Sequence, residues 1–237
     1  MQEDVIPSIL KKQDVLGVAQ TGSGKTMSYV LPILQLTQNL ALNRNRFIQV
    51  LVLVPTRKLA VQVNDVFQLF SSNLPQRIKT MAVFGGVSIN PQMMKMKGVD
   101  ILVATLGRLL DLISSNAVHL SDVKILVLDE ADKMLNLGFE EEMTNILKLL
   151  PTQLQNLLFS ATLAKEIDQI TQMILHNPLK IEIETEPQDL DLINQIAYYV
   201  EDEQKGPLLR YLIKTEEMTQ VLVFVASSRR ADGVVSK

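Results

Sequence analysis

The stretch Ala19-Gln20-Thr21-Gly22-Ser23-Gly24-Lys25-Thr26 constrains this chain more than any other. It follows a short apolar run, residues 14–18, that predicts a buried strand, and it precedes a helical pattern over residues 27–34. Strand, small-residue turn and Gly-Lys-Thr together are typical of a phosphate-binding loop, although Ala19 stands where the pattern usually has Gly. Backbone N–H groups in such a turn, and the helix N-terminus behind it, hold phosphate oxygens. We therefore expect Lys25 to reach the β- and γ-phosphates and the Thr26 hydroxyl to ligate Mg²⁺. The alternative is a Gly-rich turn with a surface Lys.

The composition excludes several kinds of site. The 237 residues include no Cys, so disulfides, thiolate metal sites and cysteine catalysis are excluded. With His119 and His176 as the only histidines, a histidine-built metal centre is not expected. No apolar run reaches membrane-spanning length, and the first residues lack the basic and apolar regions of a signal peptide. We expect a cytoplasmic protein with no membrane contact, and a nuclear location stays open.

The net charge of −3 is unevenly distributed along the chain. Residues 1–180 hold 17 Lys and Arg against 15 Asp and Glu, whereas residues 181–203 hold 8 acids and no base. Residues 204–237 carry a net charge of +3. The acidity is therefore one local segment, and a modest basic patch for nucleic acid is compatible with the remainder.

Strand-like and helix-like segments alternate along the chain. Strands are predicted at residues 14–18, 48–54, 79–84, 101–104, 124–128, 156–159 and 179–183. Helices are predicted at residues 2–10, 27–41, 57–70, 92–97, 106–113, 140–150 and 165–175. Near-continuous apolar strands between helices predict a mostly parallel, doubly wound α/β sheet, with ligands at the carboxyl ends of its strands.

The alternation restarts after an acidic segment. We predict a domain over residues 1–183, a linker over 184–192, and an incomplete second α/β unit over 193–237. That unit would contain strands at 193–200 and 220–225, and helices at 207–213 and from 227 onward. Because about 45 residues bury too little apolar surface to be stable alone, we expect this tail to be mobile, to dock on the first domain or to swap between chains.

A second chemical anchor is Asp129-Glu130-Ala131-Asp132, which follows the apolar run 125–128. A carboxylate at the end of a buried strand can hold Mg²⁺ opposite Thr26, so Asp129 is assigned to the metal. Glu130 is placed to polarise the water that attacks the γ-phosphate. Taken alone, three acids after a strand fit a helix N-terminal charge cluster equally well, and the pairing with Gly24-Lys25-Thr26 favours the metal site.

These segments resemble the DEAD-box RNA helicases over essentially the whole chain. The matching segments are residues 19–26 (motif I), 55–60 (motif Ia), Gly85-Gly86, 105–109 (motif Ib), 129–132 (motif II), 160–162 (motif III), 223–227 (motif IV), and Gln2 of the Q motif. Lys58 stands where the family usually has Glu, and Leu106 where it usually has Pro. The resemblance implies a RecA-like P-loop domain and an RNA-dependent ATPase that separates short duplexes or remodels RNA–protein complexes.

The resemblance also implies roles for particular residues. Gln2 would read the adenine of ATP, and residues 19–26 would hold its phosphates with Mg²⁺. Ser160 and Thr162 would bond to Asp132 and couple the nucleotide to domain closure. The sugar–phosphate backbone of one RNA strand would contact Pro55, Thr56, Arg57, Gly85, Gly86, Thr105, Gly107 and Arg108. Backbone contacts carry no base information, so we expect sequence-tolerant binding that weakens with salt.

The family's motifs V and VI are not found before Lys237. Because the family draws its transition-state arginine from that region, we expect this chain alone to bind ATP weakly and to hydrolyse it little above background. Two alternatives stay open at this point. One is a truncated, non-catalytic module that binds RNA or a protein partner, and the other is a P-loop ATPase that acts on DNA or proteins.

Overall fold

The structure is a computed structural model that describes residues 1–20, 22–40, 47–162, 165–183 and 194–235. The chain divides into two compact units, residues 1–186 and 187–237, each of which is treated separately below. The predicted linker, residues 184–192, lies outside the described residues.

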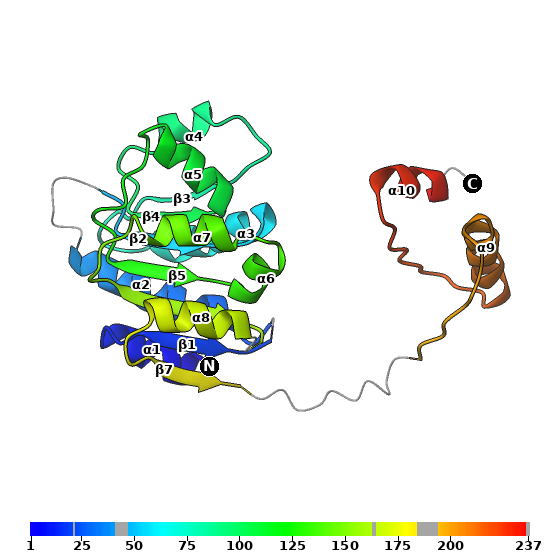
Figure 1. Cartoon of the computed structure of the whole chain (residues 1–237), viewed down its shortest axis with the longest axis horizontal. Helices are drawn as coiled ribbons and strands as arrows, with labels where there is room; N and C mark the ends of the chain where they lie inside the picture. The colour runs from blue at the N-terminus through cyan, green and yellow to red at the C-terminus, as the bar shows by residue number, and fades with distance from the viewer. Residues whose placement is uncertain (21, 41–46, 163–164, 184–193, 236–237) are drawn as a thin grey trace. The chain divides into compact units, whose positions relative to one another are not determined.

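The first unit is built on a seven-stranded sheet in the order β3-β4-β2-β5-β6-β1-β7 (Figure 1). Every strand pair in it is parallel. The strands are β1 (Val15–Val18), β2 (Val50–Leu53), β3 (Thr80–Val83), β4 (Ile101–Ala104), β5 (Ile125–Leu128), β6 (Gln155–Ser160) and β7 (Leu179–Glu182). All their carboxyl ends therefore meet at one edge of the sheet, which is where the predicted motifs begin.

Helices cover both faces of this sheet (Figure 1). They are α1 (Gln2–Leu10), α2 (Lys25–Leu40), α3 (Arg57–Ser71), α4 (Asn90–Lys95), α5 (Leu106–Ser114), α6 (Ala131–Asn136), α7 (Glu140–Leu147) and α8 (Lys165–Ile174). One apolar core lies under α5 to α8, and a second lies under α1 to α3. Strand side chains alternate between the two, since Leu51 and Leu53 join the first core and Val50 and Val52 the second.

The predicted parallel α/β fold is confirmed, and the predicted strands and helices of the first unit form within a few residues of their expected bounds. The sheet is parallel throughout its described pairs rather than mostly parallel. The short helix α6 was not predicted, because Asp132 and Lys133 interrupt its apolar pattern. None of the described helices combines the length and the apolar character needed to cross a bilayer.

The second unit differs from its prediction. It contains the short 3₁₀ helix η2 (Asp202–Gln204), α9 (Lys205–Thr215) and α10 (Ser228–Val235). The strands predicted at 193–200 and 220–225 were wrong for the described residues, which form no strand there. No described residue of this unit is buried, and Leu222 and Phe224 are 80% and 89% exposed. Apolar, β-branched segments form a stable sheet only when neighbouring elements cover them, and no described residue of this unit is covered in that way.

Candidate functional site

Three neighbouring strands bring the predicted nucleotide residues to one edge of the sheet. Strands β5, β6 and β1 are adjacent and end at Leu128, Ser160 and Val18, respectively. The Ala19 N–H donates to the Ser160 carbonyl at 3.0 Å, which fixes the phosphate loop to the end of β6. Parallel strand pairing thus brings the loop at residues 19–26 close to Asp129 and Ser160. In the sequence, 100 or more positions separate the loop from these two residues.

The phosphate loop turns on two glycines with left-handed backbone, Gly22 (φ 88°) and Gly24 (φ 84°). A Cβ on Gly24 would come within 2.6 Å of the Gln2 amide nitrogen, so a side chain there would displace Gln2 from the loop, and the left-handed backbone would strain it. The Lys25 side chain is buried, and its ammonium donates to the Ala19 carbonyl at 2.7 Å. The first residue of the loop is therefore hydrogen-bonded to the lysine near its end. Thr21, which was also predicted to bind ATP, lies outside the described residues.

Gln2 lies directly over this loop. Its side-chain amide donates to the Gly24 carbonyl at 3.4 Å, across 22 positions of sequence. Helix α1, which begins at Gln2, packs against α2 through Val5 and Ile9 in the second core. The packing of α1 therefore sets the distance between Gln2 and the phosphate loop.

Asp129 is 2% exposed at the end of β5, where it meets a partner that the sequence did not reveal. The hydroxyl of Tyr29, itself fully buried on α2, donates to Asp129 Oδ2 at 2.7 Å. Burial raises the pKa of Asp129, and the Tyr29 hydrogen bond and the nearby Lys25 charge oppose that rise. Burial also raises the pKa of Tyr29 well above its ordinary value, and the Asp129 charge adds to it. Tyr29 therefore stays protonated and holds the carboxylate in one orientation.

Glu130 adopts a left-handed backbone conformation (φ 54°, ψ 47°), which is costly for a residue with a Cβ. Its side chain is 16% exposed and forms an ion pair with Lys133 at 2.9 Å. The turn directs the two adjacent carboxylates to different partners: Asp129 is buried against the Tyr29 hydroxyl, and Glu130 pairs with Lys133.

Asp132 joins α6 to the segment after β6. Its Oδ2 accepts from the Ala161 N–H at 3.3 Å and from the Thr162 hydroxyl at 3.5 Å. The predicted bond between Ser160 and Asp132 was wrong, because the Ser160 hydroxyl donates instead to the Thr162 carbonyl at 2.8 Å. Asp132 Oδ1 is buried without a partner among the described residues. Ser160 therefore shapes the 160–162 turn, and only Thr162 reaches Asp132 through its side chain.

A second group of predicted residues follows β2, at the same edge. Pro55 is buried, and the Thr56 hydroxyl caps α3 by accepting from the Leu59 N–H at 3.2 Å. The Arg57 guanidinium is exposed and lies 4.7 Å from the centroid of the Phe84 ring. Because α3 begins here, its N-terminal N–H groups and Arg57 present positive charge together.

Three glycines at the carboxyl edge of the sheet leave the backbone exposed, without side chains over it. Gly85, Gly86 and Gly107 are exposed, and a Cβ built on any of them would meet no atom within 4 Å. Thr105 precedes α5 without a side-chain capping bond, so the first-turn N–H groups of α5 lack that partner. Exposed backbone of this kind lets another molecule's backbone approach closely.

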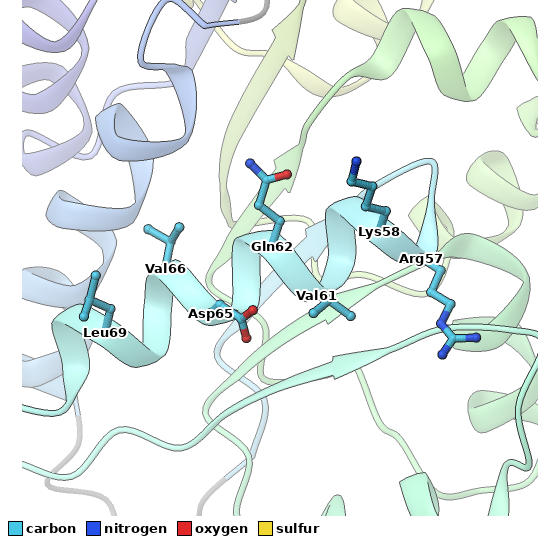
Figure 2. A pocket seen from close by; sticks show the side chains of 7 residues that line it. All are labelled: Arg57, Lys58, Val61, Gln62, Asp65, Val66 and Leu69. Atoms are coloured by element: carbon cyan, nitrogen blue, oxygen red, sulfur yellow. The ribbon is translucent and has the colours of Figure 1, made fainter. Parts of the chain in front are cut away.

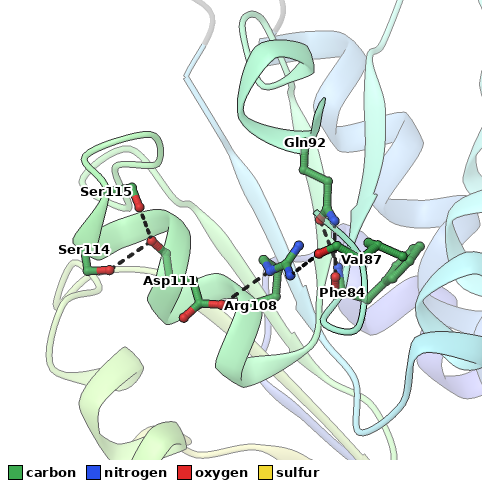
Figure 3. Close-up of polar contacts among 7 residues, drawn as sticks. All are labelled: Phe84, Val87, Gln92, Arg108, Asp111, Ser114 and Ser115. Atoms are coloured by element: carbon green, nitrogen blue, oxygen red, sulfur yellow. Dashed lines mark hydrogen bonds and ion pairs between the residues drawn. The ribbon is translucent and has the colours of Figure 1, made fainter. Parts of the chain in front are cut away.

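Arg108 has a different environment from the one predicted (Figure 3). It is 8% exposed, its Nη2 donates to the Val87 carbonyl at 2.7 Å, and its Nε pairs with Asp111 at 3.4 Å. Gln92 holds the other side of the same loop through two bonds to the Phe84 backbone, at 3.1 and 3.2 Å. Arg108 and Gln92 therefore fix the Gly85-Gly86 turn. Nη1 of Arg108 has no partner among the described residues.

Comparison with known proteins identifies the family that shares this site. A DEAD/DEAH box helicase domain matches residues 1–170. The chain belongs to the DEAD/DEAH box helicase family.

Individual helicases are similar along nearly the whole chain. The DEAD-box ATP-dependent RNA helicase RhpA of Helicobacter pylori is 36% identical over 98% of this chain and 46% of its own length. The helicase CshA of Streptococcus pneumoniae is 38% identical over 98% of this chain and 43% of its own length. A crystal structure of a hypothetical ATP-dependent RNA helicase from Sulfolobus tokodaii has a TM-score of 0.69 and 35% identity, covering 77% of this chain and 51% of that one. The chain spans about half the length of the curated relatives that it matches.

The phosphate loop and Asp129 fit a magnesium ion that is coordinated partly by the protein and partly by nucleotide phosphates. Among the described residues, no three His, Cys, Asp or Glu side chains cluster as a metal site would require. Mg²⁺ commonly takes one or two carboxylates and completes its shell with water and substrate phosphates. One buried carboxylate, Asp129, close to Lys25 and the Thr26 end of the phosphate loop, suits that shared coordination.

A hollow of about 820 Å³ lies along the outer face of the helicase helix α3 (Figure 2). Val61, Val66 and Leu69 give it apolar walls, and Leu69 is 65% exposed. None of the residues predicted to bind nucleotide lines it. This hollow is therefore separate from the residues predicted to bind nucleotide.

Sequence reasoning missed three residues of this helicase site: Tyr29, Gln92 and Lys133. Tyr29 occupies an apolar position of a helical pattern, so its hydroxyl gave no signal. Lys133 could have been paired with Glu130 from the spacing of three residues on a helix. No sequence pattern pointed to Gln92, whose bonds reach back across eight positions to a strand end.

Proposed function

We propose that this chain is the ATP- and magnesium-binding half of a DEAD-box ATP-dependent RNA helicase, and that it carries part of the RNA-binding surface. The observation that carries the proposal is the meeting of the Lys25 loop, Asp129 and the 160–162 turn at the ends of three adjacent strands. The names of the relatives, which are RNA helicases, support the choice of RNA.

The nucleotide phosphates would lie in the loop between Gly22 and Thr26. Lys25, released from the Ala19 carbonyl, would bind the β- and γ-phosphates, and the start of α2 would add its N–H groups. Gln2, already at the loop, would bind the adenine. A bound magnesium ion would neutralise phosphate charge, and Thr26 and Asp129 would hold it. Tyr29 keeps the Asp129 carboxylate oriented for that role.

Glu130 would orient the attacking water and accept its proton at a carboxylate oxygen. In the structure Oε1 of this carboxylate is paired with Lys133, and the proton would go to its other oxygen, Oε2. Asp132, joined to Ala161 and Thr162, would transmit the nucleotide state toward the end of β6. The structure supports this path through Thr162 and not through Ser160.

One RNA strand would cross the edge between α3 and α5. Arg57, the bare glycines 85, 86 and 107, and the uncapped start of α5 supply cations and N–H groups suited to phosphates. Arg108 would act by holding the Gly85-Gly86 turn, because its guanidinium is buried and bonded to the Val87 carbonyl and to Asp111. Binding through the backbone would be tolerant of sequence and sensitive to salt.

The test uses the 237-residue chain. ATP and GTP titrations should show Mg²⁺-dependent binding that favours ATP, and Gln2→Ala should remove the preference. Single-stranded RNA should bind at low salt, and Arg57→Ala should weaken it about threefold or more. Lys124, which is exposed at the amino end of β5, supplies the matched control Lys124→Ala. Failure to bind nucleotide, or binding of RNA that is indifferent to Arg57, would contradict the proposal.

Hydrolysis is a separate expectation. Because the chain spans about half of its relatives, we propose that it turns ATP over little above background on its own. Turnover that RNA stimulates strongly in the isolated chain would show that the catalytic set is complete within these residues.

A further inference from the structure

Strand β7 forms one free edge of the sheet in the first unit. It pairs in parallel with β1 and is last in the strand order, so its other side pairs with no described strand (Figure 1). The N–H groups of Leu179 and Ile183 donate to carbonyls of the β1 segment at 2.8 and 2.9 Å. Because alternate residues of a strand face the same neighbour, Lys180 and Glu182 direct their backbone groups to the free edge. Unpaired groups of this kind are a template for another strand.

The side chains of this edge form an apolar row and a charged row. Leu179, Ile181 and Ile183 are half-buried, and Ile181 packs against the second core. Lys180 and Glu182 lie on the opposite face, 51% and 48% exposed, and form an ion pair with each other at 3.3 Å. An exposed ion pair adds little to the stability of a monomer, so these two charges can exchange partners at little cost.

The order of the two charges makes the edge complementary to itself. When two copies of residues 179–183 pair antiparallel about a two-fold axis at Ile181, Lys180 of each copy lies opposite Glu182 of the other. The outward-facing backbone groups of Lys180 and Glu182 then form the hydrogen-bonded pairs. The two Ile181 side chains meet at a closely spaced pair, and Leu179 lies opposite Ile183. Backbone, apolar row and charged row thus favour the same register.

The same charges disfavour the neighbouring registers. A shift of the antiparallel pairing in one direction sets the two copies of Lys180 opposite each other, and a shift in the other direction sets the two copies of Glu182 opposite each other. Like charges directly opposite are destabilising in a strand pair. The edge therefore specifies a single symmetric arrangement, which an unrelated strand would match only if it carried Lys and Glu in this order.

We propose that two copies of this chain pair antiparallel through β7, which joins their sheets into one. This inference goes beyond the proposed function and depends on neither nucleotide nor RNA binding. Strand β7 has only four residues, so the interface is smaller than that of a stable complex. The dimer should be weak, with a dissociation constant on the order of 100 µM.

Charge reversal tests the pairing. Sedimentation equilibrium of the 237-residue chain, at concentrations that span this dissociation constant, should show monomers and dimers in exchange. Lys180→Glu gives each edge two acids, and Glu182→Lys gives it two bases. Because like charges then face each other, each variant should self-associate about tenfold more weakly. The exposed Lys124 supplies the matched control Lys124→Glu, which should dimerise like the wild type.

Mixing the two variants tests the register. In a heterodimer of Lys180→Glu with Glu182→Lys, every facing pair again joins an acid to a base, so the mixture should regain the wild-type affinity. The double variant Lys180→Glu, Glu182→Lys reverses the order of charges but keeps their complementarity, so it should self-associate as well. Lys180→Pro removes an N–H at the free edge and leaves the β1 ladder intact, so it should abolish the dimer.

Three outcomes would overturn the proposal. The first is a wild-type chain that stays monomeric over the whole range, whether or not a neutral extended peptide binds its β7 edge. The second is a dimer that is indifferent to both charge reversals and to Lys180→Pro, because its contact would lie elsewhere, such as on the exposed Leu222 and Phe224. The third is a wild-type dimer whose two reversed variants fail to pair when mixed.

Discussion

At the residue scale, the site depends on a carboxylate kept away from water. Asp129 is almost fully buried, and its Oδ2 accepts a hydrogen bond from the Tyr29 hydroxyl at 2.7 Å. An ordinary surface carboxylate would rotate freely between rotamers. Here the hydrogen bond and the packing of Tyr29 against Phe67 and Phe159 fix the orientation of the carboxylate that is proposed to hold the metal.

Removing the Tyr29 hydroxyl should therefore weaken magnesium binding more than folding. In Tyr29→Phe we expect the Mg²⁺ concentration that gives half-maximal ATP binding to rise about tenfold, because partners behind a metal ligand tune its affinity. The measurement is a Mg²⁺ titration with a fluorescent ATP analogue. Tyr198→Phe, at an exposed position of the second unit, is the matched control. An unchanged Mg²⁺ requirement in Tyr29→Phe would show that the hydroxyl serves the core alone.

Burial of Asp129 also predicts a pH dependence of stability. Burial raises the pKa of Asp129 in the folded protein above its unfolded value. The folded state thus binds the proton more tightly, and stability falls as pH rises from the unfolded pKa through the folded pKa. Asp129→Asn should unfold at a higher temperature than wild type at pH 7, by roughly 1 kcal/mol or about 2–4 °C. The difference should shrink as the pH is lowered toward 4.

Thermal unfolding followed by circular dichroism over this pH range is the measurement. A variant less stable than wild type at neutral pH would contradict the account, since it would mean that the buried charge stabilises the fold. Residue types and motif spacing predicted which side chains meet here, but not their individual bonds. The direction of the Ser160 hydroxyl and the partner of Asp129 depend on tertiary packing.

At the element scale, two helix starts form the proposed RNA-binding surface. Helices α3 and α5 both begin at the carboxyl edge of the sheet, one capped by Thr56 and the other lacking a side-chain cap. Thr56 was predicted to contact RNA, and the structure shows its hydroxyl already bonded to the Leu59 N–H. Capping and RNA contact can be separated by substitution.

Thr56→Ala should destabilise the chain by about 1 kcal/mol, because the cap is lost. Thr56→Asp should keep the cap and the stability, yet weaken RNA binding by about threefold or more, because a carboxylate now faces the phosphates. Chemical denaturation and RNA anisotropy of the same two proteins give both quantities. RNA binding by Thr56→Asp equal to wild type would place the RNA strand elsewhere.

The strands could be predicted from sequence where helices cover both faces of the sheet. Strands such as β2 and β5 are continuous apolar runs, and their positions followed from sequence within two residues. Residues 220–225 are also mostly apolar and rich in Val, yet they form no strand. Strands β2 and β5 have strands paired on both sides and helices packed on both faces, and residues 220–225 do not. This matters because β propensity reflects packing in a sheet more than an intrinsic backbone preference.

At the scale of the whole molecule, both apolar cores lie within the first unit. The second unit buries none of its described residues and exposes Ile196, Tyr199, Leu222 and Phe224. The first unit should thus fold independently of the second. A chain shortened to residues 1–186 should unfold within about 2 °C of the 237-residue chain.

Differential scanning calorimetry of the two chains provides that comparison. A much lower melting temperature for the shorter chain would show that residues 187–237 dock on the first unit and stabilise it. Amide hydrogen exchange of residues 194–235 is a second, independent measurement. We expect rapid exchange there because these residues are not buried.

The most direct test of the account is a calorimetric titration of ATP with Mg²⁺ into the 237-residue chain and into Lys25→Ala. The nucleotide is proposed to bind in the loop that closes on the Lys25 ammonium, beside Asp129. We expect binding that requires Mg²⁺ and that weakens at least tenfold, or about 1.4 kcal/mol, in Lys25→Ala, with Lys124→Ala unchanged. Equal ATP binding by wild type and Lys25→Ala would contradict the account.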